Sequence, residues 1–164
     1  MITLKPITED NFEEVLELRA SEEFVATNAY SLSESYVDLK EAIENGEQYH
    51  KHCYSIPFAI AKDDTLVGFL KLGYEDGEDI NAGGDIYWLS RFMIDEKHQG
   101  KGYGKAAMEV VIDFVKSKPH GYEVKYIYTS VVPNNHIATK LYERVGFVKT
   151  GNQLHGEDLM KLVI

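Results

Sequence analysis

The chain has 164 residues, of which 44% are hydrophobic and 27% charged, and its formal net charge is −10. This composition is ordinary for a globular protein, and the length predicts a single domain, residues 1–164, with one core. The acidic balance excludes most nucleic-acid-binding roles, because binding phosphates requires a basic face. Without a signal-peptide pattern or a long apolar run, the sequence predicts a cytoplasmic protein that has no membrane partner.

The N-terminal third is predicted to form a strand and two helices. Alternating apolar residues indicate a strand over residues 2–7, and Thr8 is the expected N-cap of a helix that ends near residue 19. Ser31 and Glu34 have capping-box spacing and open a second helix, which Gly46 would end.

Negative charge is concentrated in this N-terminal third. Residues 1–47 contain 12 acidic and three basic side chains, so most of the net charge of −10 lies there. Such a region raises the local concentration of cationic ligands, although carboxylates on two helices are equally typical of a solvated face. Cys53 is the only cysteine, so neither an internal disulfide nor a cysteine-based metal site is expected.

The rest of the chain alternates strands and helices, which predicts a mixed α/β domain. A hairpin is expected over 55–61 and 65–74, then a polar loop over 75–84 and a strand over 86–94. A helix to about residue 118, a strand over 125–131, a helix from Asn134 or Asn135 to Arg144, and two paired strands over 147–154 and 158–164 complete the series.

A glycine-rich loop lies between the strand over 86–94 and the following helix. Gly100, Gly102 and Gly104 stand at alternate positions directly before the helix. Unpaired N–H groups at a helix N-terminus attract anions, and missing side chains leave these groups accessible. The loop therefore predicts a phosphate cradle, with Lys101 and Lys105 adding positive charge at its edge.

Two familiar phosphate-binding patterns fit the loop poorly. The Walker pattern requires a hydroxyl after its lysine, and Ala106 stands there. A dinucleotide fingerprint ending in alanine fits Gly102, Gly104 and Ala107, so its spacing alone leaves that alternative open. A clear acidic partner for a ribose is nevertheless missing, since Glu123 precedes the next apolar run.

The loop also matches the pattern Q/R-x-x-G-x-G/A at Gln99, Gly102 and Gly104, and it thereby resembles the acetyl-coenzyme A loop of the GNAT superfamily of N-acetyltransferases. A second segment, from Asn135 to Phe147, is similar to the superfamily's N-x-x-A-x-x-L-Y-x-x-x-G-F motif. The resemblance covers residues 55–164 well and the N-terminal third only in outline. Trp88 to Asp95 looks most like bacterial spermine/spermidine acetyltransferases.

The resemblance implies a GNAT-like single domain with a mixed, mostly antiparallel central sheet, splayed at the cofactor site and flanked by about four helices. It also implies acetyl-CoA as co-substrate, with no metal and no acyl-enzyme. The residues expected to bind the cofactor are Phe92, Met93 and Ile94 through their main chains for the pantetheine arm, Gln99, Gly100, Lys101, Gly102, Tyr103, Gly104 and Lys105 around the pyrophosphate, and Asn135 and Ala138.

Two residues of the second motif have more specific expected roles. Asn135 is expected to cap its helix and also to contact the cofactor arm, as in the superfamily. Tyr142 lies about two turns further along, near the same face. By resemblance, Tyr142 lies near the thioester sulfur and donates a proton to the leaving thiolate.

The resemblance further implies a small cationic amine as acceptor, for which carboxylates at the mouth of the site are suited, and a homodimer that meets at the final strands. Polyamine acetyltransferases of this superfamily commonly carry a carboxylate two residues before the position of Phe92, where this chain has Ser90. The candidate acceptor-binding residues are Glu22, Glu23, Tyr30, Asp85, Tyr87 and Ser90, and the loop Glu75–Asp79 is a candidate cation funnel.

Three other functions remain open at this point. The chain could acetylate a protein N-terminus or lysine, which would require a peptide groove. It could bind coenzyme A as a weakly catalytic sensor, which Ser90 favours and Tyr142 opposes. A dinucleotide-binding protein rests only on the glycine spacing.

Overall fold

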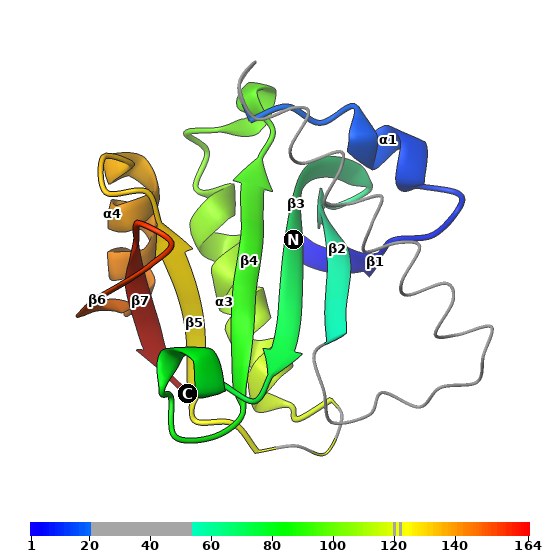
Figure 1. The fold of residues 1–164 in the computed structure, drawn as a ribbon. Coiled ribbons are helices and arrows are strands. Elements are labelled where there is room, and N and C mark those ends of the chain that lie inside the picture. Colours follow the sequence, from blue (N-terminus) through cyan, green and yellow to red (C-terminus); the bar gives the residue numbers. More distant parts are fainter. Residues whose placement is uncertain (21–53, 120, 122) are drawn as a thin grey trace.

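The computed structural model describes residues 1–20, 54–119, 121 and 123–164. Within them, seven strands form one sheet in the order β1-β2-β3-β4-β5-β7-β6 (Figure 1). All neighbours are antiparallel except β4 and β5, so the predicted mixed, mostly antiparallel sheet is confirmed. The elements are β1 Ile2–Pro6, α1 Phe12–Leu16, β2 Tyr54–Lys62, β3 Thr65–Glu75, the 3-10 turn η2 Glu78–Ile80, β4 Ile86–Ile94, the 3-10 turn η3 Glu96–His98, α3 Tyr103–Lys116, β5 Tyr126–Val131, α4 His136–Val145, β6 Val148–Leu154 and β7 Glu157–Val163.

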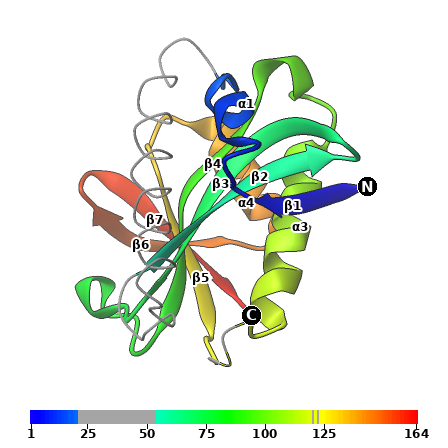
Figure 2. The same cartoon turned by 90° about the vertical axis from the view of Figure 1, so that its right-hand side faces the viewer.

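The sheet has a different helix layer on each face (Figure 2). The side chains of β3 show which helices cover which face, because successive side chains of a strand point to opposite faces of the sheet. Leu70 and Leu72 pack in one buried cluster with Met108 of α3 and Tyr142 of α4. Phe69 packs in a second cluster with residues of α1. No helix in the described part of the chain is long and apolar enough to cross a membrane.

The first helix differs from the prediction. It begins after Asn11, not at Thr8, and it ends at Leu16. The Asn11 side chain accepts a hydrogen bond from Thr8 N–H at 2.8 Å and donates one to Pro6 O at 2.9 Å. These bonds close a turn ahead of the helix, because asparagine side chains compete for backbone groups. The helix predicted from Ser31 lies outside the described residues.

Strand β4 has irregular pairing on both sides near its middle. Its parallel ladder with β5 joins only Tyr87–Leu89 to Ile127–Thr129, and the two strands then draw apart toward their carboxyl ends (Figure 1). On the β3 side the register shifts, because Leu72 pairs with Leu89 while Lys71 pairs with Arg91. Ser90 is therefore a bulge residue, and bulges re-aim the side chains that follow them.

Candidate active site

The glycine loop ends at the amino end of α3, close to where β4 ends. Gly102 is the N-cap residue, with a left-handed φ of 79°, and its carbonyl accepts the first helical hydrogen bond from Ala106 N–H at 3.2 Å. The N–H groups of residues 103–105 therefore have no acceptor within the helix. Together with the helix dipole they provide the features for which the sequence predicts a phosphate cradle, and the binding itself stays a prediction.

The three glycines of the loop serve different purposes. A Cβ added to Gly100 or Gly102 would meet nothing within 4 Å, but both residues have a left-handed φ. They keep the surface in front of the free amides open and allow the tight turn. A Cβ on Gly104 would instead lie 3.3 Å from Leu141 Cδ2, so this glycine lets α3 approach α4.

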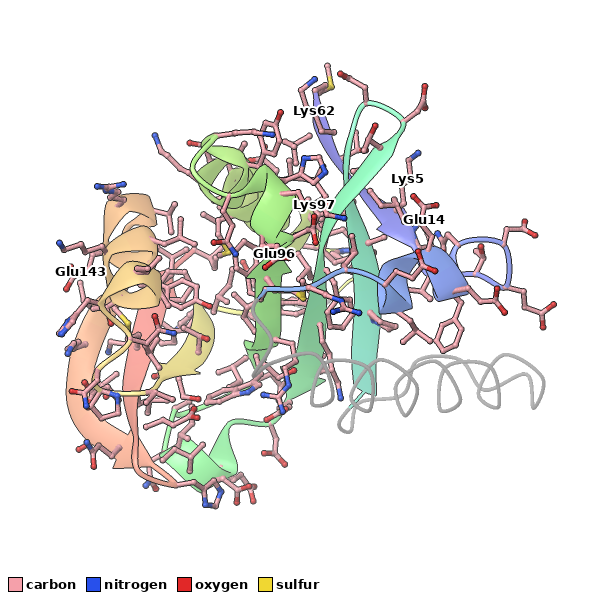
Figure 3. The ribbon with its side chains drawn as sticks, turned by 90° about the horizontal axis from the view of Figure 1, so that it is seen from above. Lys5, Glu14, Lys62, Glu96, Lys97 and Glu143 are labelled. Carbon is pink, nitrogen blue, oxygen red and sulfur yellow. The ribbon has the colours of Figure 1, made fainter. Side chains whose placement is uncertain are left out.

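The polar side chains of the loop bind backbone and side-chain groups on neighbouring segments. Lys101 Nζ donates to Lys97 O at 3.0 Å, and Lys105 Nζ lies 3.5 Å from Glu109 Oε1. Figure 3 shows Lys97 beside the amino end of α3. The Gln99 side chain donates to Ile94 O at 2.9 Å and to Ala20 O at 3.2 Å. Gln99 thus fixes the loop to the end of β4 and to the segment after α1.

Asp95 strengthens this attachment. It is one of two buried polar or charged residues in the described part of the chain, and its Oδ1 accepts a hydrogen bond from Arg19 N–H at 3.0 Å. Glu96 N–H donates in return to Arg19 O at 2.7 Å. The cradle is consequently tied to the chain segment that leads into residue 21.

We expect Asp95→Ala to lower the free energy of unfolding by about 2 kcal/mol, because it leaves the part-buried Arg19 N–H without its charged acceptor. Asp95→Asn retains an oxygen at this position and is expected to cost less than half as much. Urea unfolding measures both values. The control is Asp113→Ala, which removes one charge from an exposed position on α3. Equal losses for Asp95→Ala and Asp113→Ala would contradict the contact.

The strand residues expected to hold the pantetheine arm are placed by the alternation of β4. Phe92 and Ile94 pack against the cluster beneath α3 and α4, while Met93 is buried in the cluster beside α1. Beyond Leu89 this stretch is outside the ladder with β5. One edge of this stretch pairs with β3, the other edge is not paired with β5, and the Ile94 carbonyl accepts the hydrogen bond from the Gln99 side chain.

Asn135 and Ala138 lie at the amino end of α4, as predicted. The Asn135 side-chain oxygen accepts a hydrogen bond from Ala138 N–H at 3.1 Å, so the capping role is confirmed. The Asn135 side chain is exposed, which leaves its amide nitrogen facing solvent. A contact of Ala138 with a ligand would have to use the side chain, since its N–H is occupied.

Tyr142 is buried on α4, with 6% of its surface exposed. Its ring lies 6.4 Å from the ring of Phe92 and 5.4 Å from that of Phe147, between ring centroids. The pKa of Tyr142 is raised to about 12, chiefly by burial and also by the Glu157 carboxylate, while a side-chain interaction with Thr129 opposes the rise. The phenol is thus protonated at neutral pH and is able to donate a proton.

The raised pKa of Tyr142 predicts a loss of stability in alkali. A group whose pKa is raised by folding stabilises the fold fully below its unfolded pKa of about 10, and this share is lost as pH rises toward 12. We expect Tyr142 to account for a loss of about 1 kcal/mol in the free energy of unfolding by about pH 11. Urea unfolding at pH 9 and 11 tests this, and Tyr142→Phe should show a smaller decline. Parallel declines would contradict it.

The candidate acceptor residues are only partly brought together. Asp85 Oδ2 accepts a hydrogen bond from the Tyr74 hydroxyl at 2.6 Å, and Ser90 Oγ lies 3.4 Å from Lys71 O. Tyr87 is 1% exposed and packs edge-on against Tyr74, which places it in the core. Glu22, Glu23 and Tyr30 lie outside the described residues.

An acidic segment covers the end of β3 and the turn that follows it. We call Glu75, Asp76, Glu78 and Asp79 the acidic loop. Partial burial and the neighbouring Asp76 and Asp79 raise the pKa of Glu75. Carboxylates that repel one another in this way are stabilised by a bound cation. The described residues include no group of three potential metal ligands.

Sequence reasoning missed Asp95 and Thr129. Asp95 directly follows an apolar strand, which marks it as a residue at a strand end, but its hydrogen bond to Arg19 joins positions 76 residues apart. Thr129 sits within a strand of ordinary β-forming residues and gives no local signal. Neither contact follows from spacing.

Comparison with known proteins supports the motifs described above. The model of a family described as "Acetyltransferase (GNAT) family" matches residues 12–147. A spermine/spermidine N(1)-acetyltransferase of Bacillus subtilis is 34% identical over 161 residues, which is 97% of this chain and 96% of that protein.

Solved structures share the fold at lower identity. The PaiA N-acetyltransferase of Thermoplasma acidophilum, in complex with coenzyme A, aligns with a TM-score of 0.69 at 17% identity over 100% of this chain and 99% of its own. A spermidine N-acetyltransferase of Vibrio cholerae, in complex with CoA and spermine, aligns with a TM-score of 0.68 at 18% identity over 99% and 95%.

Proposed function

Because the chain belongs to the acetyltransferase (GNAT) family and is an acetyl-CoA-dependent N-acetyltransferase, we propose that its acceptor is a polyamine such as spermidine or spermine. We further propose that residues 1–164 form one catalytic domain. The observation that carries the acceptor assignment is the similarity, over nearly the full length, to the Bacillus spermine/spermidine enzyme. The acidic loop supports it, because like-charged carboxylates favour a cation.

We propose that the amides at the start of α3 bind the diphosphate of acetyl-CoA. Their missing helical acceptors and the open surface at Gly100 and Gly102 support this role. The main chain of Phe92–Ile94, beyond the β4–β5 ladder, would bind the pantetheine arm, and Asn135 would contact it from α4. Acetyl-CoA supplies an acetyl group on a thioester, whose C–S bond breaks as the new N–C bond forms.

Tyr142 is the proposed proton donor. Its pKa of about 12 keeps the phenol protonated, and its ring lies beside Phe92 of β4. A thiolate whose conjugate acid has a pKa of about 8.5 accepts a proton readily. The position of the proton donor therefore matters more than its acid strength.

The acceptor must lose a proton before it attacks. An alkylamine with a pKa of about 10.4 is mostly protonated at neutral pH. Ser90 stands where a carboxylate is common in polyamine acetyltransferases, and Asp85 is occupied by the Tyr74 hydroxyl. We propose that the proton leaves through water toward the acidic loop, where the raised pKa of Glu75 makes that carboxylate a better proton acceptor.

The test follows the release of free thiol from acetyl-CoA by purified protein. Spermidine, spermine, putrescine, lysine and a short peptide are compared at equal concentration. We expect spermidine and spermine to react with the highest kcat/KM. A preference for the peptide would overturn the polyamine assignment. Tight coenzyme A binding without thiol release for any amine would instead identify a sensor.

Neutralising the acidic loop should weaken polyamine binding selectively. We expect Asp76→Asn combined with Asp79→Asn to raise the KM for spermidine about fivefold at low salt, because the variant removes carboxylates that attract the cation. The KM for acetyl-CoA should change little. The effect on spermidine should be smaller at high salt, because ions screen long-range attraction. Steady-state kinetics at two salt concentrations measures this. The control is Glu143→Gln, an exposed carboxylate on the outer side of α4 (Figure 3). An unchanged KM in the loop variant would show that the loop is only solvated.

A further inference from the structure

Gln99 stands where the chain passes from η3 into the glycine loop. Its backbone is extended, with φ of −66° and ψ of 161°, and the next residue, Gly100, has a left-handed φ of 73°. Although Gln99 is exposed, its side-chain nitrogen donates two hydrogen bonds, to Ile94 O at 2.9 Å and to Ala20 O at 3.2 Å. One side chain therefore joins the end of β4 to a segment that lies 79 residues earlier in the chain.

These two hydrogen bonds use all the donors of the Gln99 side chain. A glutamine amide nitrogen carries two hydrogens, and here each carbonyl accepts one of them. The other polar atom of the side chain is an oxygen, which accepts hydrogen bonds and is repelled by the oxygens of a diphosphate. The two carbonyls also decide which end of the amide is the nitrogen, because an oxygen in its place would face two acceptors. The Gln99 side chain is therefore unsuited to binding a diphosphate directly.

The two carbonyls that Gln99 holds belong to segments that border the glycine loop. Ile94 meets both ends of the loop, because its carbonyl binds Gln99 while its Cγ1 would lie 3.8 Å from a Cβ added to Gly104 at the start of α3. Ala20 follows Arg19, whose N–H and carbonyl are bound by the residues directly after β4, at 3.0 and 2.7 Å. Gln99 thus completes an attachment of the loop to β4 on one side and to the segment after α1 on the other.

We infer that Gln99 is a positioning residue of the cofactor site and not a ligand of the cofactor: its amide joins the Ile94 and Ala20 carbonyls and so fixes the direction in which the glycine loop leaves β4. This inference rests on the proposed binding of the acetyl-CoA diphosphate by the amides at the start of α3. A loop that is already held in its binding geometry avoids the entropy cost of being ordered by the ligand. Loss of the two hydrogen bonds should therefore weaken cofactor binding without removing a contact to the cofactor.

The first test measures the affinity for coenzyme A by isothermal titration calorimetry. Gln99→Met keeps the length of the side chain without its donors and should raise the Kd about 10-fold, the usual scale for one or two lost hydrogen bonds. Gln99→Arg supplies N–H donors again and should bind within about threefold of the parent.

The control for this test is Gln153→Met, which removes the hydrogen bond of another exposed glutamine, to Asp158 in the β6–β7 hairpin. This variant should bind coenzyme A as the parent does. Parent affinity in Gln99→Met would overturn the inference. A loss in Gln99→Arg as large as that in Gln99→Met would also overturn it, because the donors would then not be the cause.

The second test needs no ligand and separates positioning from contact with the cofactor. The N–H of Glu96 donates to Arg19 O at 2.7 Å, so its hydrogen exchange in the free protein, followed by NMR, reports how firmly the segment after α1 is attached. We expect Gln99→Met to speed this exchange at least about threefold and Gln99→Arg to restore the parent rate.

The two measurements together distinguish the ways in which the inference could fail. Weaker coenzyme A binding with a parent exchange rate in Gln99→Met would assign the side chain to the cofactor itself and overturn the positioning role. Faster exchange with parent affinity would show that the attachment does not affect the cofactor site, which also overturns it. If the parent protein binds no coenzyme A, the proposed cradle fails and this role fails with it, while the exchange rates still show whether Gln99 holds the loop.

Discussion

Replacement of Gly102 by alanine is expected to weaken coenzyme A binding at least about 30-fold. Gly102 has a left-handed φ of 79°, where a Cβ costs of the order of 1 kcal/mol in strain, and that strain favours rearrangement of the first turn of α3. The same Cβ would meet no protein atom within 4 Å, so it would occupy space beside the proposed diphosphate site. Isothermal titration calorimetry with coenzyme A measures the affinity.

The chain contains a matched control for this substitution. Gly83 also has a left-handed φ, of 77°, and a Cβ added there also meets nothing within 4 Å, but it lies in the loop before β4. Gly83→Ala should lose a similar amount of stability and bind coenzyme A as the parent does. If both alanine variants retain parent affinity, the cradle is misassigned. If both lose affinity equally, the effect comes from general destabilisation.

Conversion of Tyr142 to phenylalanine is expected to lower kcat about 100-fold and to leave coenzyme A affinity within about twofold of the parent value. General acids typically contribute about 10² to 10⁴ in rate, and a thiolate leaving group places this donor at the low end. The aromatic contacts with Phe92 and Phe147 do not depend on the hydroxyl, so the site should retain its shape. Stopped or continuous measurement of thiol release gives kcat.

Tyr128 provides the comparison for Tyr142. It is also 6% exposed, and burial raises its pKa as well, but it packs with Ile86 and Leu159 in a separate cluster. Tyr128→Phe should retain nearly full kcat. Equal losses in the two variants would indicate that removing a buried hydroxyl harms the fold, and an unchanged kcat in Tyr142→Phe would remove it from the mechanism.

The sequence predicted those elements best that carry strong local signals. The strand Ile86–Ile94 has the predicted bounds, and Gly146 ends α4 with a left-handed φ of 107°. Glycine at a helix end and apolar runs between polar turns act over a few residues, so the sequence displays them directly. The cap at Asn135 belongs to the same class.

The sequence predicted least well those features that depend on distant partners. Thr8 was predicted to cap the first helix. The Asn11 side chain instead accepts a hydrogen bond from Thr8 N–H and donates one to Pro6 O, and the helix begins after Asn11. The bulge at Ser90 arises from its register with β3, which no local pattern shows. The contacts of Asp95 with Arg19 and of Thr129 with Leu89 span 76 and 40 residues. Such pairs follow only from the folded topology.

The short parallel ladder between β4 and β5 has a mechanical consequence. Three residue pairs and the Thr129 hydroxyl are the strand-to-strand link between β1-β2-β3-β4 and β5-β7-β6 in the described sheet. A ligand that binds along β4 and also contacts α4 would add contacts between the two parts of the domain that this short ladder joins. Ligand binding should therefore slow amide hydrogen exchange in Ile127–Thr129 more than in β2, which lies away from the β4–β5 ladder. A lower exchange rate at these residues would then indicate that the site is occupied.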